Sequence, residues 1–185
     1  LTNYTNIARD CGVDAKTVKE YYRILEDTLL GTMLEPFAKR RGRDVILKAG
    51  KFFLFDVGVA GVLGRRHLSE ERGEAFGRAF EHFILMELLA HRSYRELEHE
   101  TRFWRTKSGL EVDYVLGAGE VAIEVKGGRR IASTEFRPLE AFVEEHRPRL
   151  ALLVCNESRP RQHGSVRVLP WRDFLDQLWG GEIVA

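Results

Sequence analysis

Cysteine is scarce in this sequence, and long apolar runs are absent. The 185 residues include two cysteines, too few for a disulfide framework or a four-cysteine zinc site. The longest apolar-rich stretch, Phe83 to Ala90, is interrupted by Glu87 and falls far short of the ~20 residues that a bilayer-spanning helix needs. These absences exclude a disulfide-stapled secreted domain and a membrane-spanning protein. We expect a reducing, cytoplasmic setting with no membrane partner.

Two further features are missing from the chain. No signal peptide opens it, and it begins at Leu1 without a methionine, which suggests a piece of a longer protein. The nucleotide-binding motif Gly-x-x-x-x-Gly-Lys-Ser/Thr does not occur, because Gly50-Lys51 is followed by Phe52. We therefore expect no ATP hydrolysis by this chain itself.

Composition and length indicate a globular protein of one or two domains. Hydrophobic residues make up 44% of the chain and charged residues 31%. The charge is uneven, since residues 1–66 carry 12 Lys or Arg against 8 Asp or Glu, whereas residues 67–185 carry 17 against 20. Charges and glycine between Arg65 and Gly73 separate two differently patterned halves. We predict two domains, residues 1–66 and residues 67–185.

The start of the chain has the pattern of two short helices joined by a tight turn. Within Thr5–Leu25, apolar residues recur at helical spacing on both sides of Gly12-Val13. Asp14 is placed to cap the second helix, because its carboxylate can accept hydrogen bonds from the first-turn N–H groups. The side chains of this helix expected to face outward are Lys16, Thr17, Lys19 and Arg23.

A basic segment lies between two strand-like runs, Leu29–Phe37 and Val45–Phe55. As expected for a hairpin tip that contacts phosphate, it contains Lys39, Arg40, Arg41, Arg43, Lys48 and Lys51. Two helices followed by a basic hairpin are the layout of a winged helix-turn-helix, which lays its second helix in the DNA major groove. We predict that DNA is bound by Lys16, Thr17, Lys19, Arg23, Lys39, Arg40, Arg41 and Arg43. The alternatives are a solvated loop without a partner and a protein-docking module.

The second half predicts a helix, three strands and a β-α-β crossover. The helix Glu74–His91 has one apolar side, and continuous apolar runs are typical of central strands. The fold class is therefore α/β, α+β overall, with an αβββαβ core. The expected elements after the first helix are the strands 103–105, 111–116 and 121–126, the helix 138–146, the strands 150–155 and 166–169, and the helix 171–179.

The hairpin between the second and third strands brings two carboxylates together. A turn at Ala118-Gly119 sets Asp113 directly opposite Glu124, and strand alternation puts Lys126 on the face of Glu124. The other face is expected to carry Val112, Tyr114 and Val125. Two carboxylates at this distance repel each other unless a cation or a proton lies between them. Mg²⁺ takes such ligands, and the lysine can orient the attacking water or stabilise a phosphate.

A structural interpretation of these charges stays open. The same register puts Glu111 opposite Lys126, so the lysine can instead form a cross-strand ion pair on a solvated sheet face. Glu81 lies at the flank of the apolar face of the first helix, where a carboxylate needs a partner. Glu87 lies nearer the centre of that face and is the second choice. The six histidines show no metal spacing; His82 and His99 are expected at the surface, and His91 as a satisfied histidine.

With Glu81, Asp113 and Glu124-Val125-Lys126 in this order, the second half resembles the PD-(D/E)XK nuclease-like superfamily, which includes restriction endonucleases. The segments Phe53–Gly58, Ala79–Phe83, Phe103–Leu116 and Ile123–Lys126 resemble the C-terminal part of a prokaryotic AAA-type ATPase family, a part labelled a domain of unknown function. The resemblance implies a nucleotide-binding ATPase domain before Leu1. It implies Glu81, Asp113 and Glu124 as Mg²⁺ ligands, and these three with Lys126 as the catalytic set. Where superfamily members carry a proline before the aspartate, this chain has Val112.

Two functions from different classes follow. The first is a Mg²⁺-dependent nuclease-like domain that a winged helix delivers to DNA, with ATP used only by a domain outside this chain. The second is a non-catalytic module that binds DNA or a protein on behalf of that ATPase domain.

Overall fold

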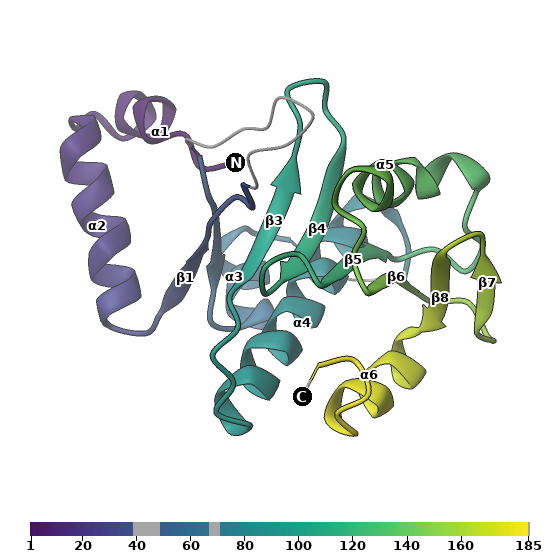
Figure 1. Cartoon of the computed structure of the whole chain (residues 1–185). Coiled ribbons are helices and arrows are strands. Elements are labelled where there is room, and N and C mark those ends of the chain that lie inside the picture. The colour runs from purple at the N-terminus through teal and green to yellow at the C-terminus, as the bar shows by residue number, and fades with distance from the viewer. Residues whose placement is uncertain (39–48, 67–70, 185) are drawn as a thin grey trace.

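The chain folds into a mixed α/β structure with two sheets, here a computed structural model that describes residues 1–38, 49–66 and 71–184 (Figure 1). Within these ranges no helix is long and apolar enough to cross a membrane. Residues 1–66 contribute the helices α1 (Tyr4–Cys11), α2 (Ala15–Asp27) and α3 (Val57–Leu63) and the strands β1 (Gly31–Leu34) and β2 (Lys51–Leu54). The remaining elements are α4 (Gly73–Tyr94), β3 (Thr101–Arg105), β4 (Glu111–Leu116), β5 (Val121–Lys126), the 3₁₀ turn η1 (Ser133–Phe136), α5 (Arg137–His146), β6 (Leu150–Cys155), β7 (Arg161–His163), β8 (Val166–Pro170) and α6 (Trp171–Trp179).

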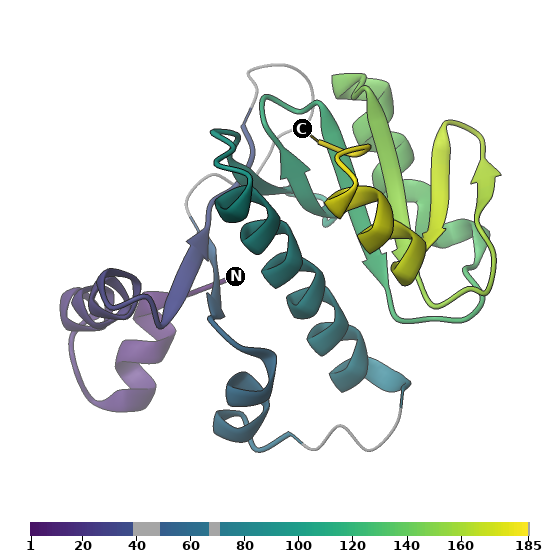
Figure 2. The ribbon, with the colours of Figure 1, turned by 90° about the horizontal axis from the view of Figure 1, so that it is seen from below.

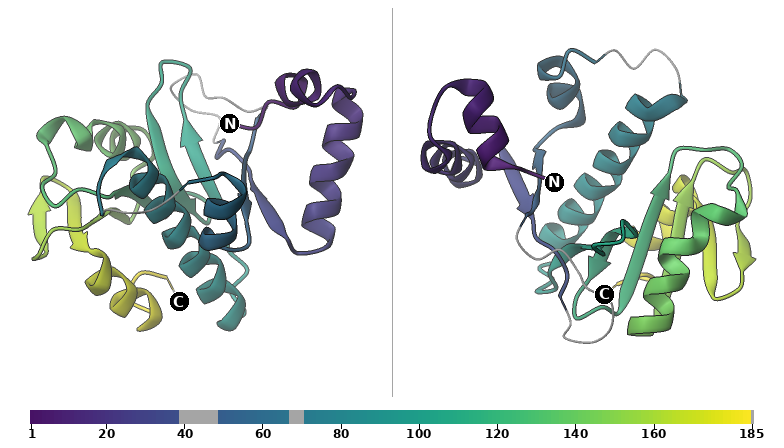
Figure 3. Two further views of the ribbon diagram at one scale, coloured as in Figure 1. Left: turned by 180° about the vertical axis from the view of Figure 1, so that it is seen from behind. Right: turned by 90° about the horizontal axis from the view of Figure 1, so that it is seen from above.

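The predicted helix, tight turn and helix at the start of the chain is confirmed. Gly12 ends α1 in the left-handed conformation at φ 67°, which costs glycine nothing. Asp14 then caps α2, because its Oδ1 accepts the Thr17 backbone N–H at 2.9 Å. Figures 1 and 3 show α1 and α2 at the end of the molecule beyond β1, on the far side from β7.

The strands that follow are shorter than predicted. Strand β1 covers 31–34 of the run 29–37, and β2 covers 51–54 of the run 45–55, of which residues 45–48 lie outside the described residues. The two strands pair antiparallel, with Thr32 opposite Phe53. Much of the basic segment, including Lys39, Arg40, Arg41 and Arg43, lies outside the described residues.

The main sheet has six strands in the order β3-β4-β5-β6-β8-β7. Strands β3, β4 and β5 are antiparallel, whereas β5, β6 and β8 run parallel. Helices α4 and α6 pack on one face, with Ile84 and Phe174 fully buried there, and α5 packs on the other face through Phe142 (Figure 2). The predicted order of helix, three strands, helix and strand is thus present, with the predicted bounds for β4, β5 and β6.

Strand β4 contains an extra residue that the sequence did not reveal. Its pairing with β3 shifts between Arg102↔Val115 and Trp104↔Val112. Between these two pairs β4 advances by three residues and β3 by two, which is a β-bulge in β4. The prediction that Val112 and Tyr114 lie on the same face of the sheet is therefore wrong. Val112 packs in the core beneath α5, and Tyr114 packs in the core beneath α4 with Val125.

The hairpin of β1 and β2 is joined to the main sheet at β3. The Phe103 N–H donates to the Glu35 carbonyl at 3.1 Å, and the Phe37 N–H donates to the Phe103 carbonyl at 2.5 Å. Leu34 and Phe37 are buried in the cores on opposite faces of the main sheet. The predicted division at residue 66 stays a prediction, and the structure shows that the first part contributes side chains to the core of the second.

Candidate active site

The β4–β5 hairpin brings Asp113 and Glu124 together in the interior. The observed pairs include Tyr114↔Ile123 and Leu116↔Val121, which is the predicted register. The Val125 N–H donates to Asp113 Oδ2 at 2.9 Å and fixes the aspartate beside β5. Asp113 is 7% exposed and Glu124 is 3% exposed, so both carboxyl groups are withdrawn from water. The sheet face here is buried rather than solvated.

Burial makes ionisation of this pair unfavourable. Burial first, and then the charges of Glu124 and Glu81, raise the pKa of Asp113 well above its usual value. Burial also raises the pKa of Glu124 to about 7, although Lys126 opposes it. Glu124 Oε2 is buried and has no hydrogen-bond partner among the described residues. The pair therefore keeps an unmet need for positive charge or for a proton.

Lys126 pairs with Glu124 rather than across the hairpin. Its Nζ donates to Glu124 Oε1 at 2.6 Å. Burial alone would lower the pKa of Lys126, but the carboxylates of Glu124 and Asp113 outweigh it and raise that pKa. The alternative ion pair with Glu111 is not formed, because Glu111 accepts from Arg105 Nη1 at 2.7 Å. Lys126 thus lies at the acidic pair with its ammonium group charged.

A second lysine, Lys51 of β2, also reaches the acidic residues. Its Nζ lies 3.0 Å from Glu81 Oε1 and 3.8 Å from Asp113 Oδ1, and it contacts Glu111 Oε1 more closely still. Burial would lower the pKa of Lys51, but Asp113, Glu81 and Glu111 together raise it. The side chain of Lys51 points toward the carboxylates of Glu81, Glu111 and Asp113. The assignment of Lys51 to a phosphate-contacting hairpin tip is therefore wrong.

Glu81 lies at the site through α4, as predicted from its place at the margin of the apolar face. Its backbone carbonyl accepts from the Tyr114 hydroxyl at 2.8 Å, which ties α4 to β4 next to Asp113. Glu87, the second choice, lies elsewhere on α4 and accepts from Trp179 Nε1 at 3.0 Å. Glu81, Asp113, Glu124 and Lys126 therefore share one electrostatic environment that excludes Glu87.

Two carboxylates, Asp113 and Glu124, suit a Mg²⁺ ion better than the predicted set of three that includes Glu81. Among the described residues, no group of three or more His, Cys, Asp or Glu side chains is arranged to hold a metal ion. Mg²⁺, however, commonly takes only one or two carboxylates and fills its other positions with water and substrate oxygens. Asp113 and Glu124 with its unpartnered Oε2 fit that requirement. Glu81 is engaged by Lys51, and its role as a third ligand stays a prediction.

The residues predicted to bind DNA are placed only in part. Lys16, Lys19 and Arg23 are exposed on α2, where Arg23 lies 3.8 Å from Asp27. Thr17 is half-buried, and its hydroxyl donates to Asp14 Oδ2 at 2.8 Å.

The histidines differ from expectation at two positions. His82 is 7% exposed rather than a surface residue, and its Nε2 lies 2.7 Å from the Leu54 carbonyl. His91 is buried against Trp179, yet neither ring nitrogen has a hydrogen-bond partner among the described residues, so it is not a satisfied histidine.

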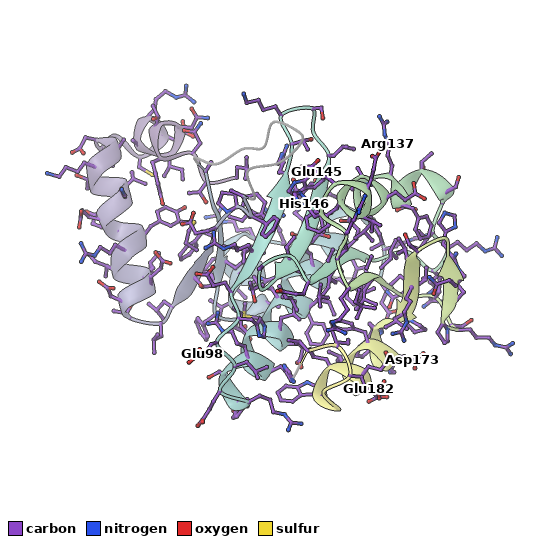
Figure 4. All side chains as sticks on the ribbon, viewed as in Figure 1. Glu98, Arg137, Glu145, His146, Asp173 and Glu182 are labelled. Carbon is purple, nitrogen blue, oxygen red and sulfur yellow. The ribbon has the colours of Figure 1, made fainter. Side chains whose placement is uncertain are left out.

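A separate buried pair lies at the end of α5. His146 Nε2 is 3.2 Å from Glu145 Oε1, and both side chains are labelled in Figure 4. The His146 ring packs against Phe142 and edge-on against Phe37. This pair belongs to the packing of the sheet face opposite α4.

Two basic side chains at the acidic site, Lys51 and Arg105, were not among the residues predicted for it. In the sequence, Lys51 stands directly before the apolar residues 52–55 and close to a basic segment, so its position resembles that of a hairpin tip. Only the docking of β2 against α4 and β4 gives it another role.

Two family models match separate parts of the chain. A family model described as a domain of unknown function, DUF8612, matches residues 1–70. No curated protein and no solved structure matches the chain. A second family model, described as domain of unknown function DUF4143, matches residues 76–174, more than half of the chain and all of the acidic site. The chain therefore belongs to the DUF4143 family.

Proposed function

We propose that this chain is the DNA-processing part of an AAA-type ATPase. In this proposal residues 1–66 form a winged helix-turn-helix that binds DNA, and the following part is a PD-(D/E)XK nuclease-like domain that hydrolyses phosphodiesters with Mg²⁺. The order of α4, three strands, α5 and β6 supports the nuclease-like assignment. The pairing of β1 with β2 after two helices supports the winged helix.

One observation carries the catalytic part of the proposal. Asp113 and Glu124 are both buried, lie beside Lys126, and leave one carboxylate oxygen without a partner. Two facing carboxylates in the interior destabilise a fold unless a cation or proton compensates them. A site that binds a divalent cation and a phosphate explains why this cost is present.

The residues divide the chemistry between them. Mg²⁺ bound by Asp113 and Glu124 would act as a Lewis acid on the phosphate and lower the pKa of a water molecule. The Val125 N–H keeps the Asp113 carboxylate oriented. Lys126 lies at the end of β5 with a charged ammonium group, where it holds the attacking water or stabilises the negative charge that develops on the phosphate.

The rest of the chain would supply substrate binding. The exposed Lys16, Lys19 and Arg23 of α2 present positive charge suited to phosphate contacts, and the basic segment 39–48 adds more. These contacts are independent of DNA sequence and raise the local concentration of substrate. An ATPase domain in the same protein would be the partner that uses ATP.

DNA cleavage in Mg²⁺ tests this proposal. The purified chain is incubated with single-stranded, duplex and branched DNA, alongside Asp113→Asn and Lys126→Met. Glu120→Gln is the matched control, because Glu120 is an exposed carboxylate directly before β5. We expect cleavage by the wild type and the control that EDTA and both site substitutions abolish. Cleavage that survives Asp113→Asn would refute the assignment of the site.

A non-catalytic module is the second candidate, and Lys51 favours it. This lysine already neutralises part of the acidic cluster, as a structural ion pair would. That function predicts DNA binding without cleavage, with affinity that falls when Lys19 or Arg23 is replaced by alanine. Fluorescence anisotropy with labelled duplex DNA measures it.

A further inference from the structure

Lys51 places a positive charge of the N-terminal part inside the acidic site. Its side chain is 13% exposed and lies among carboxylates from α4 and β4. The nearest oxygens belong to Glu81, Glu111 and Asp113, and Glu111 is the closest. The two sides of this contact come from parts of the chain that different family models match. Lys51, the first residue of β2, thus provides a positive charge that partly neutralises these carboxylates.

The position of this ammonium group conflicts with a divalent ion on the same carboxylates. Asp113 Oδ2 already accepts the Val125 N–H, and the remaining oxygen, Oδ1, lies 3.8 Å from Lys51 Nζ. A Mg²⁺ ion at about 2 Å from Oδ1 would therefore stand within a few ångströms of the ammonium group. Two cations so close in a buried site repel each other strongly. One of them has to leave, or Asp113 has to bind the metal less tightly.

We propose that Lys51 competes with the divalent metal for the Asp113 carboxylate, so that the β1–β2 hairpin holds the site in a metal-poor resting state. The hairpin is joined to β3 through Phe103, and Lys51 follows the basic segment 39–48 by three residues. Movement of β2 would withdraw the ammonium group and expose Asp113. This inference rests on the proposed metal-dependent function and adds regulation to it.

Direct Mn²⁺ binding tests the competition without any reference to activity. Free Mn²⁺ is measured by electron paramagnetic resonance during titration of the wild type, Lys51→Met and Lys51→Arg. Lys19→Met is the matched control, because it removes an exposed lysine of the same part of the chain. We expect Lys51→Met to bind Mn²⁺ at least about tenfold more tightly than the wild type. Lys51→Arg, which keeps the charge, and the control should bind like the wild type.

Lys51→Gln provides a second route if Lys51→Met does not fold. It removes the positive charge and keeps a polar side chain beside Glu81 and Glu111, and it leaves the proposed ligands Asp113 and Glu124 intact. Loss of the competing charge should then give tighter Mn²⁺ binding as well.

The outcomes separate this inference from the proposed function. Equal Mn²⁺ affinity in the wild type, Lys51→Met and Lys51→Gln overturns the competition and leaves the metal-dependent function standing. Absence of Mn²⁺ binding in all of them, with folding verified by circular dichroism, overturns both.

Discussion

Replacement of Glu124 by glutamine probes the electrostatics of the acidic site. The substitution keeps the size of the side chain and removes its charge. In the wild type, burial raises the pKa of the Glu124 carboxyl to about 7 from 4.5, against the opposing effect of Lys126. Because Oε2 has no hydrogen-bond partner among the described residues, the exchange breaks no contact at that atom.

The sign and size of the effect follow from proton linkage. The folded protein holds this proton more tightly than the unfolded chain, so the free energy of unfolding falls as the pH rises from 4.5 to about 7. Each pH unit between these values corresponds to 1.36 kcal/mol, so ionisation of Glu124 costs about 3 kcal/mol once the pH is above about 7. Below 4.5 the carboxyl is neutral in both states, and this cost is absent.

We therefore expect Glu124→Gln to be more stable than the wild type by about 1–3 kcal/mol near pH 8 and close to it near pH 4.5. Urea unfolding followed by tryptophan fluorescence at both pH values measures the difference. Glu120→Gln is the control and should differ little from the wild type at either pH value, because Glu120 is exposed and Glu124 is unchanged in this variant. A Glu124→Gln variant that is less stable than the wild type near pH 8 would refute the reasoning.

Two further predictions concern the fold. Asp14→Ala should lower the free energy of unfolding by about 1 kcal/mol, because it removes the cap of α2, whereas the exposed Asp10→Ala should change it by less than about 0.5 kcal/mol. An equal loss in both variants would count against the cap. Leu152→Ala, in the fully buried centre of β6, should cost about 2–5 kcal/mol in urea unfolding. A loss below about 1 kcal/mol would show that this side of the sheet is not close-packed.

The sequence predicted those elements that local patterns define. The apolar run of β6 and the closing helix α6 have the bounds that periodicity indicated, and the turn at Gly12 was visible from glycine and the cap at Asp14. Helix α3 and strand β7 were missed because each is short, and α3 contains two glycines. Short elements owe their conformation to tertiary packing rather than to intrinsic propensity.

The candidate site was predicted as far as strand pairing determines it. The register that places Asp113 opposite Glu124 follows from the position of the turn between β4 and β5. The burial of both carboxyl groups could not be predicted from the hydrophobic pattern or from the spacing of the acidic residues. The extra residue in β4 could not be predicted, because it depends on pairing with β3. The same holds for Lys51, which reaches the site only because β2 packs beside α4.

The most direct test of the account is nicking of supercoiled plasmid DNA in Mg²⁺ by the wild type and by Glu124→Gln. The account predicts nicking by the wild type that EDTA stops, and a loss of at least about 100-fold in the variant, the same variant that is expected to be more stable. Nicking at the wild-type rate by Glu124→Gln, or a wild type that binds DNA and never cuts it in Mg²⁺, would contradict the account.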